Sequence, residues 1–270
     1  MTVTRRETLA TFAAAAFRGT FTNAAAEPSL GGELPPGWEG LYFPFDAPVA
    51  DLRPDGSPAR DGVLPEFDLP RRMYAGEDTV FHRPLRYGEV VEQVARRGDV
   101  VEKQGRGGRL VFADVVREYR VAGELAIEST WHDVFLETTP PSRAGAPVPA
   151  ESPDWTEEVR LDSRQLFRFS ALTFNTHRVH FDRDWARGAE GLTDLLVHGP
   201  LTRVLLLDAA VRHDPGSRVH AFTFRAQAPI FVDTTVSIGG RRNGDTTDVH
   251  AVDATGNLLA RGRVMWGPSH

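Results

Sequence analysis

Two histidines and an amide lie close together in the second half of the chain. The run Phe167–Ala186 contains His180, His177 and Asn175. An imidazole titrates near neutral pH and can both accept and donate a proton, and an amide can hold water or substrate by hydrogen bonds. Further along, Gly199–Pro200 opens an apolar segment, and the unpaired N–H groups at a helix start can bind an oxyanion. This combination favours an enzyme over a binding module.

The composition limits the possible classes of protein. The chain has 270 residues, of which 41% are hydrophobic and 25% charged, as in a globular protein of one or two domains. A net charge of −6 argues against nucleic acid or an anionic membrane surface as partner. No run approaches the roughly 20 apolar residues of a membrane span. The absence of cysteine excludes disulfides and cysteine-ligated metals, and it fits a cytoplasmic location.

A segment rich in Pro, Ala and Ser divides the chain. Residues 138–153 show no periodic apolar pattern, which is typical of a linker. We therefore predict an N-terminal unit over residues 1–140, a linker over residues 141–153 and a C-terminal unit over residues 154–270.

The two units repeat one order of segments. Each has a proline-containing apolar segment, at residues 81–91 and 224–233, which we interpret as a strand. Each then continues through β-rich segments to a glycine hairpin, at residues 122–126 and 255–259. The repeat predicts two copies of one architecture.

The elements that must position the histidines are helical. Asp162 can cap a helix whose apolar stripe includes Leu166 and Phe169. Residues 200–211 are apolar on nearly every face, which predicts a buried helix wrapped by a sheet. We expect an α+β fold in which a curved antiparallel sheet cradles one buried helix, occurring twice.

Four segments resemble the hotdog-fold hydratase and dehydratase superfamily. They are LFRFSALTFNTHRVHFD at residues 166–182, VHGPL at 197–201, FHRPLRYG at 81–88 and PPGWEGLYF at 35–43. The closer resemblance is to the double-hotdog MaoC-like branch, which contains mesaconyl-CoA and itaconyl-CoA hydratases and mitochondrial-type hydroxyacyl-thioester dehydratases. It implies an α+β double hotdog, a pseudo-dimer in one chain with two antiparallel sheets each wrapping a central helix. The N-terminal hotdog would have lost its catalytic loop and would provide room for the substrate.

The resemblance also implies an activity. Water would be added or removed across the α,β bond of a 2-enoyl or 3-hydroxyacyl thioester of coenzyme A or acyl carrier protein, without metal or redox cofactor. The Gly199 N–H would stabilise the thioester oxygen, with the glycine letting the substrate approach closely, and His180 would move protons. Related single-hotdog hydratases have the loop Asp-x-Asn-Pro-x-His, which places Asn175 at the Asp and His177 at the Asn. Because an amide is not a base, Asn175 can only orient water or substrate, and His180, helped by His177, remains the proton carrier.

Three neighbouring residues carry alternative interpretations. Arg178 could bind a carrier phosphate or, for a C4 or C5 diacid, the substrate carboxylate, or it could form a surface ion pair. Asp182 could orient His180 or cap a short helix over residues 184–188. His198 precedes the oxyanion glycine and could contact substrate.

Two other functions remain open from the sequence. Hotdog proteins also hydrolyse thioesters, although that reaction usually needs a carboxylate to activate water, and this loop offers only Asp182. The replacement of Asp by Asn175 also leaves room for a non-catalytic acyl-binding or cyclisation-guiding hotdog. A double hotdog already contains the pairing that single hotdogs gain by dimerising, so we expect a monomer or a homodimer.

Overall fold

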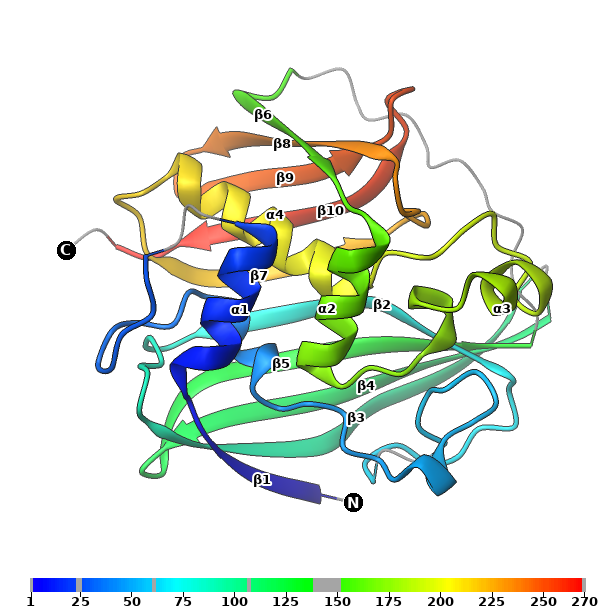
Figure 1. Cartoon of the computed structure of the whole chain (residues 1–270). Helices are drawn as coiled ribbons and strands as arrows, with labels where there is room; N and C mark the ends of the chain where they lie inside the picture. Colours follow the sequence, from blue (N-terminus) through cyan, green and yellow to red (C-terminus); the bar gives the residue numbers. More distant parts are fainter. Residues whose placement is uncertain (1, 23–25, 60–61, 106–107, 138–151, 269–270) are drawn as a thin grey trace.

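The computed structural model describes residues 2–22, 26–59, 62–105, 108–137 and 152–268. They form one antiparallel sheet in the order β1-β3-β4-β5-β2-β7-β10-β9-β8-β6 (Figure 1). The strands of the first half are β1 (Thr2–Thr8), β2 (Arg71–Phe81), β3 (Val90–Gly105), β4 (Gly108–Val121) and β5 (Glu124–Leu136). Those of the second half are β6 (Trp155–Arg160), β7 (Val219–Ala226), β8 (Thr235–Asn243), β9 (Thr246–Val252) and β10 (Leu258–Trp266).

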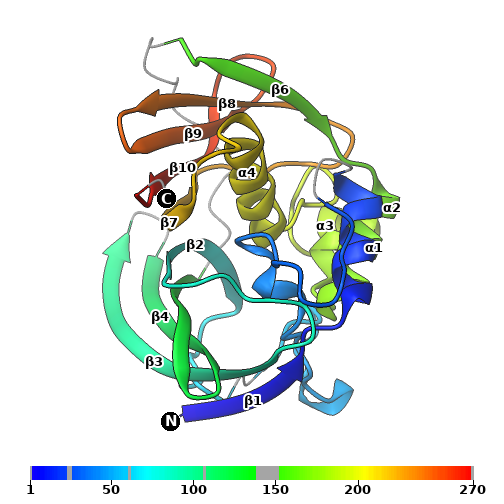
Figure 2. The same cartoon turned by 90° about the vertical axis from the view of Figure 1, so that its left-hand side faces the viewer.

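The helices lie inside the curved sheet and along its open side. They are α1 (Thr11–Phe21), α2 (Ser163–Thr173), α3 (Arg183–Gly188) and α4 (Gly199–His213), with 3-10 turns η1 (Trp38–Leu41), η2 (Val49–Asp51) and η3 (Arg178–His180). Figure 2 shows the sheet curling around α4, while α1 and α2 lie side by side at its open edge. Within the described residues, none of these helices has the length and apolar character needed to cross a membrane.

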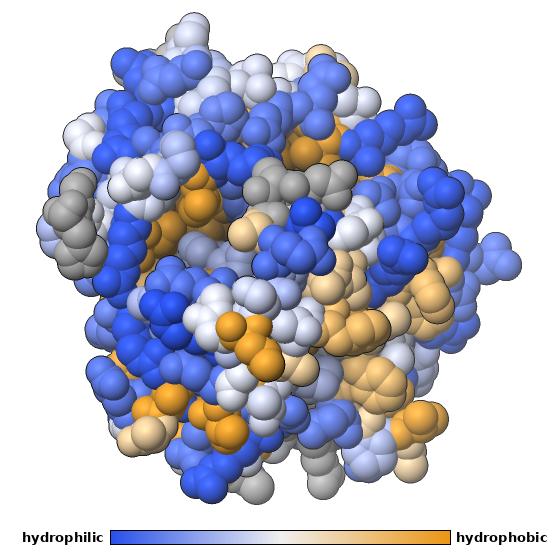
Figure 3. Space-filling view, turned by 60° about the vertical axis from the view of Figure 1, so that its left-hand side comes forward, coloured by the Kyte–Doolittle hydropathy of each residue, from blue (hydrophilic) through white to orange (hydrophobic). Residues whose placement is uncertain are grey.

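The strands of the two halves meet at one pair in the described sheet. Strand β2 pairs with β7 from Gly76 opposite Arg225 to Val80 opposite Ala221. The expected pair of sheets is therefore continuous across the middle of the molecule. On the face shown in Figure 3, hydrophilic residues dominate and apolar side chains form small groups or line a hollow.

The internal repeat is visible in the order and bonding of the elements. In each half an edge strand is followed by an 11-residue helix and later by four consecutive strands. The His82 N–H donates to the Ala126 carbonyl at 2.9 Å, and the Gln227 N–H donates to the Leu259 carbonyl at 2.9 Å. These bonds tie equivalent corners to β5 and β10, so the second half repeats the first.

The two proline-containing segments are those corners. We interpreted residues 81–91 and 224–233 as strands, and this was wrong for most of each segment. Strand β2 ends at Phe81 and β7 ends at Ala226, each three residues before the proline of its segment. Proline lacks the N–H that a central strand must donate to its neighbour, which explains why the ladder stops there.

The second half has the predicted helices. Asp162 caps α2 by accepting from the backbone N–H groups of Arg164 and Gln165, and the Gln165 side chain completes a capping box. Helix α4 is buried on nearly every face, and it contacts β7, β8, β9 and β10 as well as β2. The expectation of a buried helix wrapped by a sheet is confirmed for this half.

The first half lacks such a helix among its described residues. Helix α1 packs against α2, with the rings of Phe17 and Phe169 6.3 Å apart. Between α1 and β2, where α4 stands in the repeat, the described chain has only the 3-10 turns η1 and η2. The expectation of one cradled helix in each half therefore holds only for the second.

The predicted linker lies almost entirely outside the described residues. Strand β5 ends at Leu136 and β6 begins at Trp155, on either side of it. The domain boundaries at residues 1–140, 141–153 and 154–270 stay a prediction.

Candidate active site

The histidine loop begins where α2 ends. Phe174 ends the helix in the left-handed conformation, with φ of 51°, and turns the chain out of it. The Asn175 side-chain oxygen then accepts the His177 N–H at 3.0 Å, which forms a local turn. The loop continues into η3, which contains His180. The amide of Asn175 thus shapes the loop that carries both histidines.

A turn of the first half holds this loop in place. The Arg178 N–H donates to the Asp55 carbonyl at 2.7 Å, and the Thr176 hydroxyl donates to the Gly56 carbonyl at 2.7 Å. Gly56 has φ of +81°, and a Cβ there would lie 1.9 Å from the Thr176 carbonyl oxygen. Only glycine allows this close approach. This contact between the turn and the histidine loop was not predicted from the sequence, although Pro54-Asp55-Gly56 is a recognisable turn signal.

His180 is held as a neutral imidazole in one orientation. Its side chain is buried, and its Nδ1 lies 2.7 Å from the Leu196 carbonyl oxygen. Because a carbonyl only accepts, Nδ1 carries the hydrogen and Nε2 keeps its lone pair. Burial, and then the neighbouring His177, lower the pKa of His180 to about 3. At neutral pH this side chain is a proton acceptor.

His198 packs directly on His180. The two ring centroids are 3.6 Å apart and the planes are inclined by 21°. The Nε2 of His198 lies 2.9 Å from the Ser170 hydroxyl, while its buried Nδ1 has no hydrogen-bond partner among the described residues. Burial, and then His180, hold the pKa of His198 well below its usual value. Since His198 is fully buried, it is placed to support the His180 ring.

His177 completes the group from the outer side. Its ring lies edge-on to His180 with centroids 5.5 Å apart, and its Nε2 is 3.9 Å from a carboxylate oxygen of Asp55. Burial lowers the pKa of His177, and Asp55 opposes that effect. The loop and the start of α4 therefore bring together His177, His180 and His198. One carboxylate of the first half, that of Asp55, lies beside His177.

Gly199 opens α4 next to this cluster. As the first residue of the helix, it has an N–H without an intrahelical acceptor. A Cβ on Gly199 would lie 2.4 Å from the Tyr74 ring. The absent side chain therefore makes room for Tyr74. That it also lets the substrate approach closely stays a prediction. The oxyanion role of the Gly199 N–H stays a prediction.

Arg178 and Asp182 pair with each other. The guanidinium of Arg178 donates to one carboxylate oxygen of Asp182 at 2.7 Å and lies 3.9 Å from the centre of the Trp185 ring. The other oxygen of Asp182 accepts the Trp185 N–H and caps α3. The surface ion pair, one of three alternatives for Arg178, and the helix cap, one of two for Asp182, are the arrangements found.

An open cavity of about 1070 Å³ extends from the loop into the first half. Asn175 and Pro200 line it, whereas the three histidines and Gly199, their neighbours in the chain, are not among the lining residues. Of the aromatic and apolar residues near η1, Trp38, Leu41 and Tyr42 are buried in the core, and Leu41 and Phe43 line the cavity. The start of the loop and the start of α4 thus open on the same space.

Sequence analysis also missed a buried charged group beside the cavity. Arg203 of α4 lies 3.6 Å from Glu39 and 3.4 Å from Glu77, and all three are almost completely buried. Burial raises the pKa of Glu39, and Arg203 opposes that effect. These residues are far apart in the sequence, so no local pattern announces them. In the part of the chain that is described, no three His, Asp or Glu side chains converge to hold a metal ion.

Comparison with known proteins gives one consistent family. The family model described as hydroxyacyl-thioester dehydratase type 2 matches residues 37–232. The mesaconyl-C(4)-CoA hydratase of Chloroflexus aurantiacus is 39% identical over 94% of this chain and 91% of its own. A MaoC-like dehydratase from Phytophthora capsici has the same fold with a TM-score of 0.72, at 15% identity over 100% of this chain and 96% of its own.

The fold comparison includes a protein described as a double hotdog. This Mycobacterium tuberculosis protein matches with a TM-score of 0.60, at 15% identity over 99% of this chain and 96% of its own. The predicted α+β double-hotdog fold is confirmed. The match to the family model and the 39% identity to the hydratase confirm the resemblance found in the sequence. The chain belongs to the hydroxyacyl-thioester dehydratase type 2 family.

Proposed function

We propose that this protein adds or removes water across the α,β bond of an acyl-CoA thioester. The name of the family refers to the dehydration of hydroxyacyl thioesters. The name of the Chloroflexus relative refers to the reverse reaction, the hydration of an enoyl-CoA. The observation that carries the proposal is the orientation of His180. Its Nδ1–H donates to Leu196, so its Nε2 is an acceptor fixed beside the start of α4.

Hydration then proceeds by proton transfer at one imidazole. His180 Nε2 takes a proton from water as the water oxygen bonds to the β carbon. The electron pair of the α,β bond moves toward the thioester oxygen, which the Gly199 N–H stabilises at the positive end of α4. The protonated His180 returns its proton to the α carbon, and dehydration is the same path reversed. No metal or redox cofactor enters these steps.

The cavity of the first half provides the room for the acyl group. Asn175 and Pro200 line it next to the histidine loop and the start of α4, and the reacting carbons would lie at this part of the cavity. Asn175 cannot act as a base, because its amide does not take up a proton near neutral pH, and it orients water or substrate there by hydrogen bonds. His177 supports the same loop, and His198 holds the His180 ring by stacking. One chain supplies both halves of this arrangement.

Thioester hydrolysis is less well supported by the loop. The carboxylate that the loop offers, Asp182, is engaged by Trp185 and Arg178. Hydrolysis would need this group free beside the carbonyl carbon.

The test is the substitution His180→Ala with His220→Ala as a matched control. His220 lies on an exposed position of β7. With crotonyl-CoA we expect H180A to lose at least about a hundredfold in hydration rate, measured as loss of enoyl absorbance with the thioester intact, while H220A stays within twofold. Normal turnover in folded H180A would refute the assignment. Release of free thiol by the wild type would indicate hydrolysis instead, and no reaction at all would favour a binding role.

The substitution Asn175→Asp tests the departure from the related loops. We expect activity to be retained or raised, because a carboxylate can both orient and activate water. A folded but inactive N175D protein would show that the amide itself is required.

A further inference from the structure

One carboxylate of the first half lies beside the histidine cluster. Asp55 follows η2 in the segment between α1 and β2, where the second half has its central helix. Its side chain is 11% exposed, and its Oδ2 lies 3.9 Å from Nε2 of His177, whose side chain is 23% exposed. Within the described residues, no other carboxylate lies at ion-pair distance from His177, His180 or His198. The negative charge at the cluster therefore comes from the other half of the chain.

The turn around Asp55 fixes the direction of this carboxylate. Its Oδ1 accepts the Ser57 backbone N–H at 2.8 Å and the Ser57 hydroxyl at 2.6 Å. Its Oδ2 accepts no hydrogen bond among the described residues and is the oxygen nearest to His177. The Asp55 carbonyl also accepts the Arg178 N–H at 2.7 Å, which ties the turn to the residue after His177. The turn thus presents one carboxylate oxygen to the histidine loop at a fixed position.

The ring of His177 has no other polar partner in the part of the chain that is described. Its backbone N–H is bound by the Asn175 side chain, but neither ring nitrogen forms a hydrogen bond there. The ring lies edge-on to His180, with centroids 5.5 Å apart. A carboxylate attracts an imidazole N–H and so orients the ring that carries it. The charge of Asp55 is therefore the interaction that can hold the His177 ring in its place beside His180.

The other charged groups near the cluster have the opposite effect or are already paired. Burial is the main cause that lowers the pKa of His177. The Asp55 carboxylate opposes this effect, and the guanidiniums of Arg53 and Arg72 add to it. On the histidine loop itself, Arg178 is paired with the carboxylate of the loop. Among the described residues, Asp55 is thus the group that favours a positive charge at these rings.

His180 needs such a group during the reaction. When its Nε2 takes a proton from water, the ring becomes positive in a buried position beside two other imidazoles. A buried positive charge is unfavourable unless a negative charge lies nearby. The Asp55 carboxylate is one ring away, because His177 contacts both groups.

We propose that Asp55 is a positioning residue of the active site. Its carboxylate holds the His177 ring beside His180 and stabilises the positive charge that His180 carries after it has taken a proton. Asp55 does not line the cavity, so it acts through His177 without touching the substrate. This inference rests on the proposed function, since that function assigns the proton transfer to His180. The first half then contributes to the chemistry as well as to the room for the acyl group.

The first test removes the charge and keeps the turn. In Asp55→Asn the amide oxygen can still accept both bonds from Ser57, and the backbone bond from Arg178 is unchanged. We expect kcat for crotonyl-CoA to fall at least about tenfold and KM to change less than twofold, because the charge on His180 develops only during the reaction. The control Asp51→Asn removes a solvent-exposed carboxylate of the same segment and should change kcat less than twofold. Wild-type kcat in folded D55N would overturn the proposal.

A second variant decides if D55N does not fold. Ser57→Ala keeps the carboxylate but removes its hydroxyl bond of 2.6 Å, so Asp55 is held less firmly. We expect a smaller fall in kcat, about two- to fivefold, again with little change in KM. Without a folded D55N, an unchanged kcat in S57A would overturn the proposal.

The pH profile separates this role from a structural one. The free enzyme needs neutral imidazoles, and the Asp55 carboxylate favours their protonated form. Its removal should therefore move the acid limb of kcat/KM to lower pH, so that D55N loses less activity at acid pH than at neutral pH. A structural defect would lower kcat/KM by the same factor at every pH. An acid limb at the wild-type position in D55N would overturn the proposal.

Titration of His177 tests the contact without turnover. Followed by NMR, its midpoint should lie at lower pH in D55N than in the wild type and should be unchanged in D51N. The wild-type midpoint in D55N would overturn the role of Asp55 while hydration by His180 stands. A lower midpoint in D55N, in a protein whose wild type hydrates no enoyl thioester, would overturn the proposed function and keep the contact between Asp55 and His177.

Discussion

The two halves share one fold, but the concave faces of their sheets differ in polarity. In the second half this face carries apolar side chains that pack on α4, such as Phe222, Ile238 and Val249. In the first half the equivalent strands place Glu77 and Arg117 at a cavity, beside apolar residues of the lining. Among the described residues the first half has no equivalent of α4, so part of its concave face borders the cavity and is not covered by a helix.

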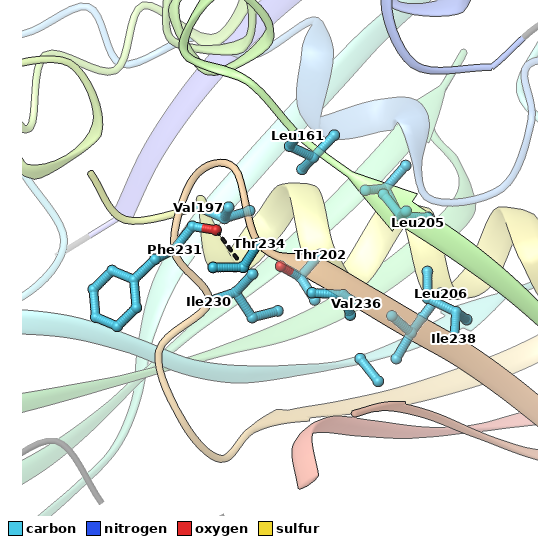
Figure 4. Close-up of a pocket in the computed structure, with 12 residues that line it drawn as sticks. Leu161, Val197, Thr202, Leu205, Leu206, Ile230, Phe231, Thr234, Val236 and Ile238 are labelled. Carbon is cyan, nitrogen blue, oxygen red and sulfur yellow. Dashed lines mark hydrogen bonds between the residues drawn. The ribbon is translucent and has the colours of Figure 1, made fainter. Parts of the chain in front are cut away.

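The second half also contains a cavity, but its lining is almost entirely apolar. A smaller cavity of about 340 Å³ lies between α4 and strands β6 and β8 (Figure 4). Leu205 and Leu206 of α4 face Val236 and Ile238 across it, and the hydroxyl of Thr234 is bonded to the Phe231 carbonyl. An ionised carboxylate would find no charged partner there and would lose its hydration.

The largest expected effect contrasts one leucine from each half. Leu206→Ala removes a fully buried side chain from α4, and we expect it to lower the free energy of unfolding by about 3–5 kcal/mol. Leu41→Ala removes a side chain that is almost fully buried in the same core but also borders the open cavity, where the space left can fill with water, so it should cost roughly half as much. Urea unfolding monitored by circular dichroism measures both. Equal losses would show that the cavity does not lessen the cost at residue 41.

The next effect tests whether the first half positions the loop of the second. Gly56→Ala would force its Cβ against the Thr176 carbonyl, so the histidine loop must move. We expect kcat/KM to fall at least about tenfold, because displacement of a catalytic group by about 1 Å is costly. The control is Gly123→Ala, whose φ of +86° carries a similar backbone cost but whose added Cβ meets nothing within 4 Å. Equal activity losses in the two variants would show that the turn at Gly56 does not position the histidine loop.

The sequence was sufficient where the signals are local. The cap at Asp162, the buried helix α4 and the hairpin strands follow from capping, periodicity and β propensity, and they were found where expected. The proline corners were mistaken for strands because their apolar pattern resembles one, and only the missing N–H groups distinguish them. The absent central helix and the Arg203–Glu77 contact could not be predicted, since they depend on residues brought together by the fold.

The third prediction concerns pH, and the two halves should respond with opposite sign. His180 has a folded pKa of about 3, below its unfolded value near 6.5, so the unfolded state gains a proton first on acidification. Its contribution to stability is complete above about pH 6.5, and about 2 kcal/mol of it is lost between pH 7 and pH 5. In H180Q the fall in unfolding free energy over this range should be correspondingly smaller, as measured by urea unfolding at both pH values.

His132 of β5 provides the opposing case in the first half. It bridges Asp78 and Asp114, and hydrogen bonding to Asp78 raises its pKa above the usual value. Its contribution is present below the unfolded pKa and is lost as pH rises through the folded pKa. Replacing it by Gln should therefore make the acid-induced loss of stability steeper than in the wild type. A shallower loss in H132Q would contradict the sign assigned to this half.

The smallest effect concerns a surface contact between the halves. Arg178 pairs with Asp182 and reaches the Pro54 carbonyl at 3.3 Å, both near solvent. Exposed ion pairs contribute little, so Arg178→Gln should change the free energy of unfolding by less than about 1 kcal/mol and the KM for crotonyl-CoA less than twofold. A tenfold rise in KM with normal folding would show that Arg178 leaves Asp182 to bind the CoA phosphates. The backbone bond from Arg178 to Asp55 would then remain the part of this contact that holds the loop, because the substitution does not touch it.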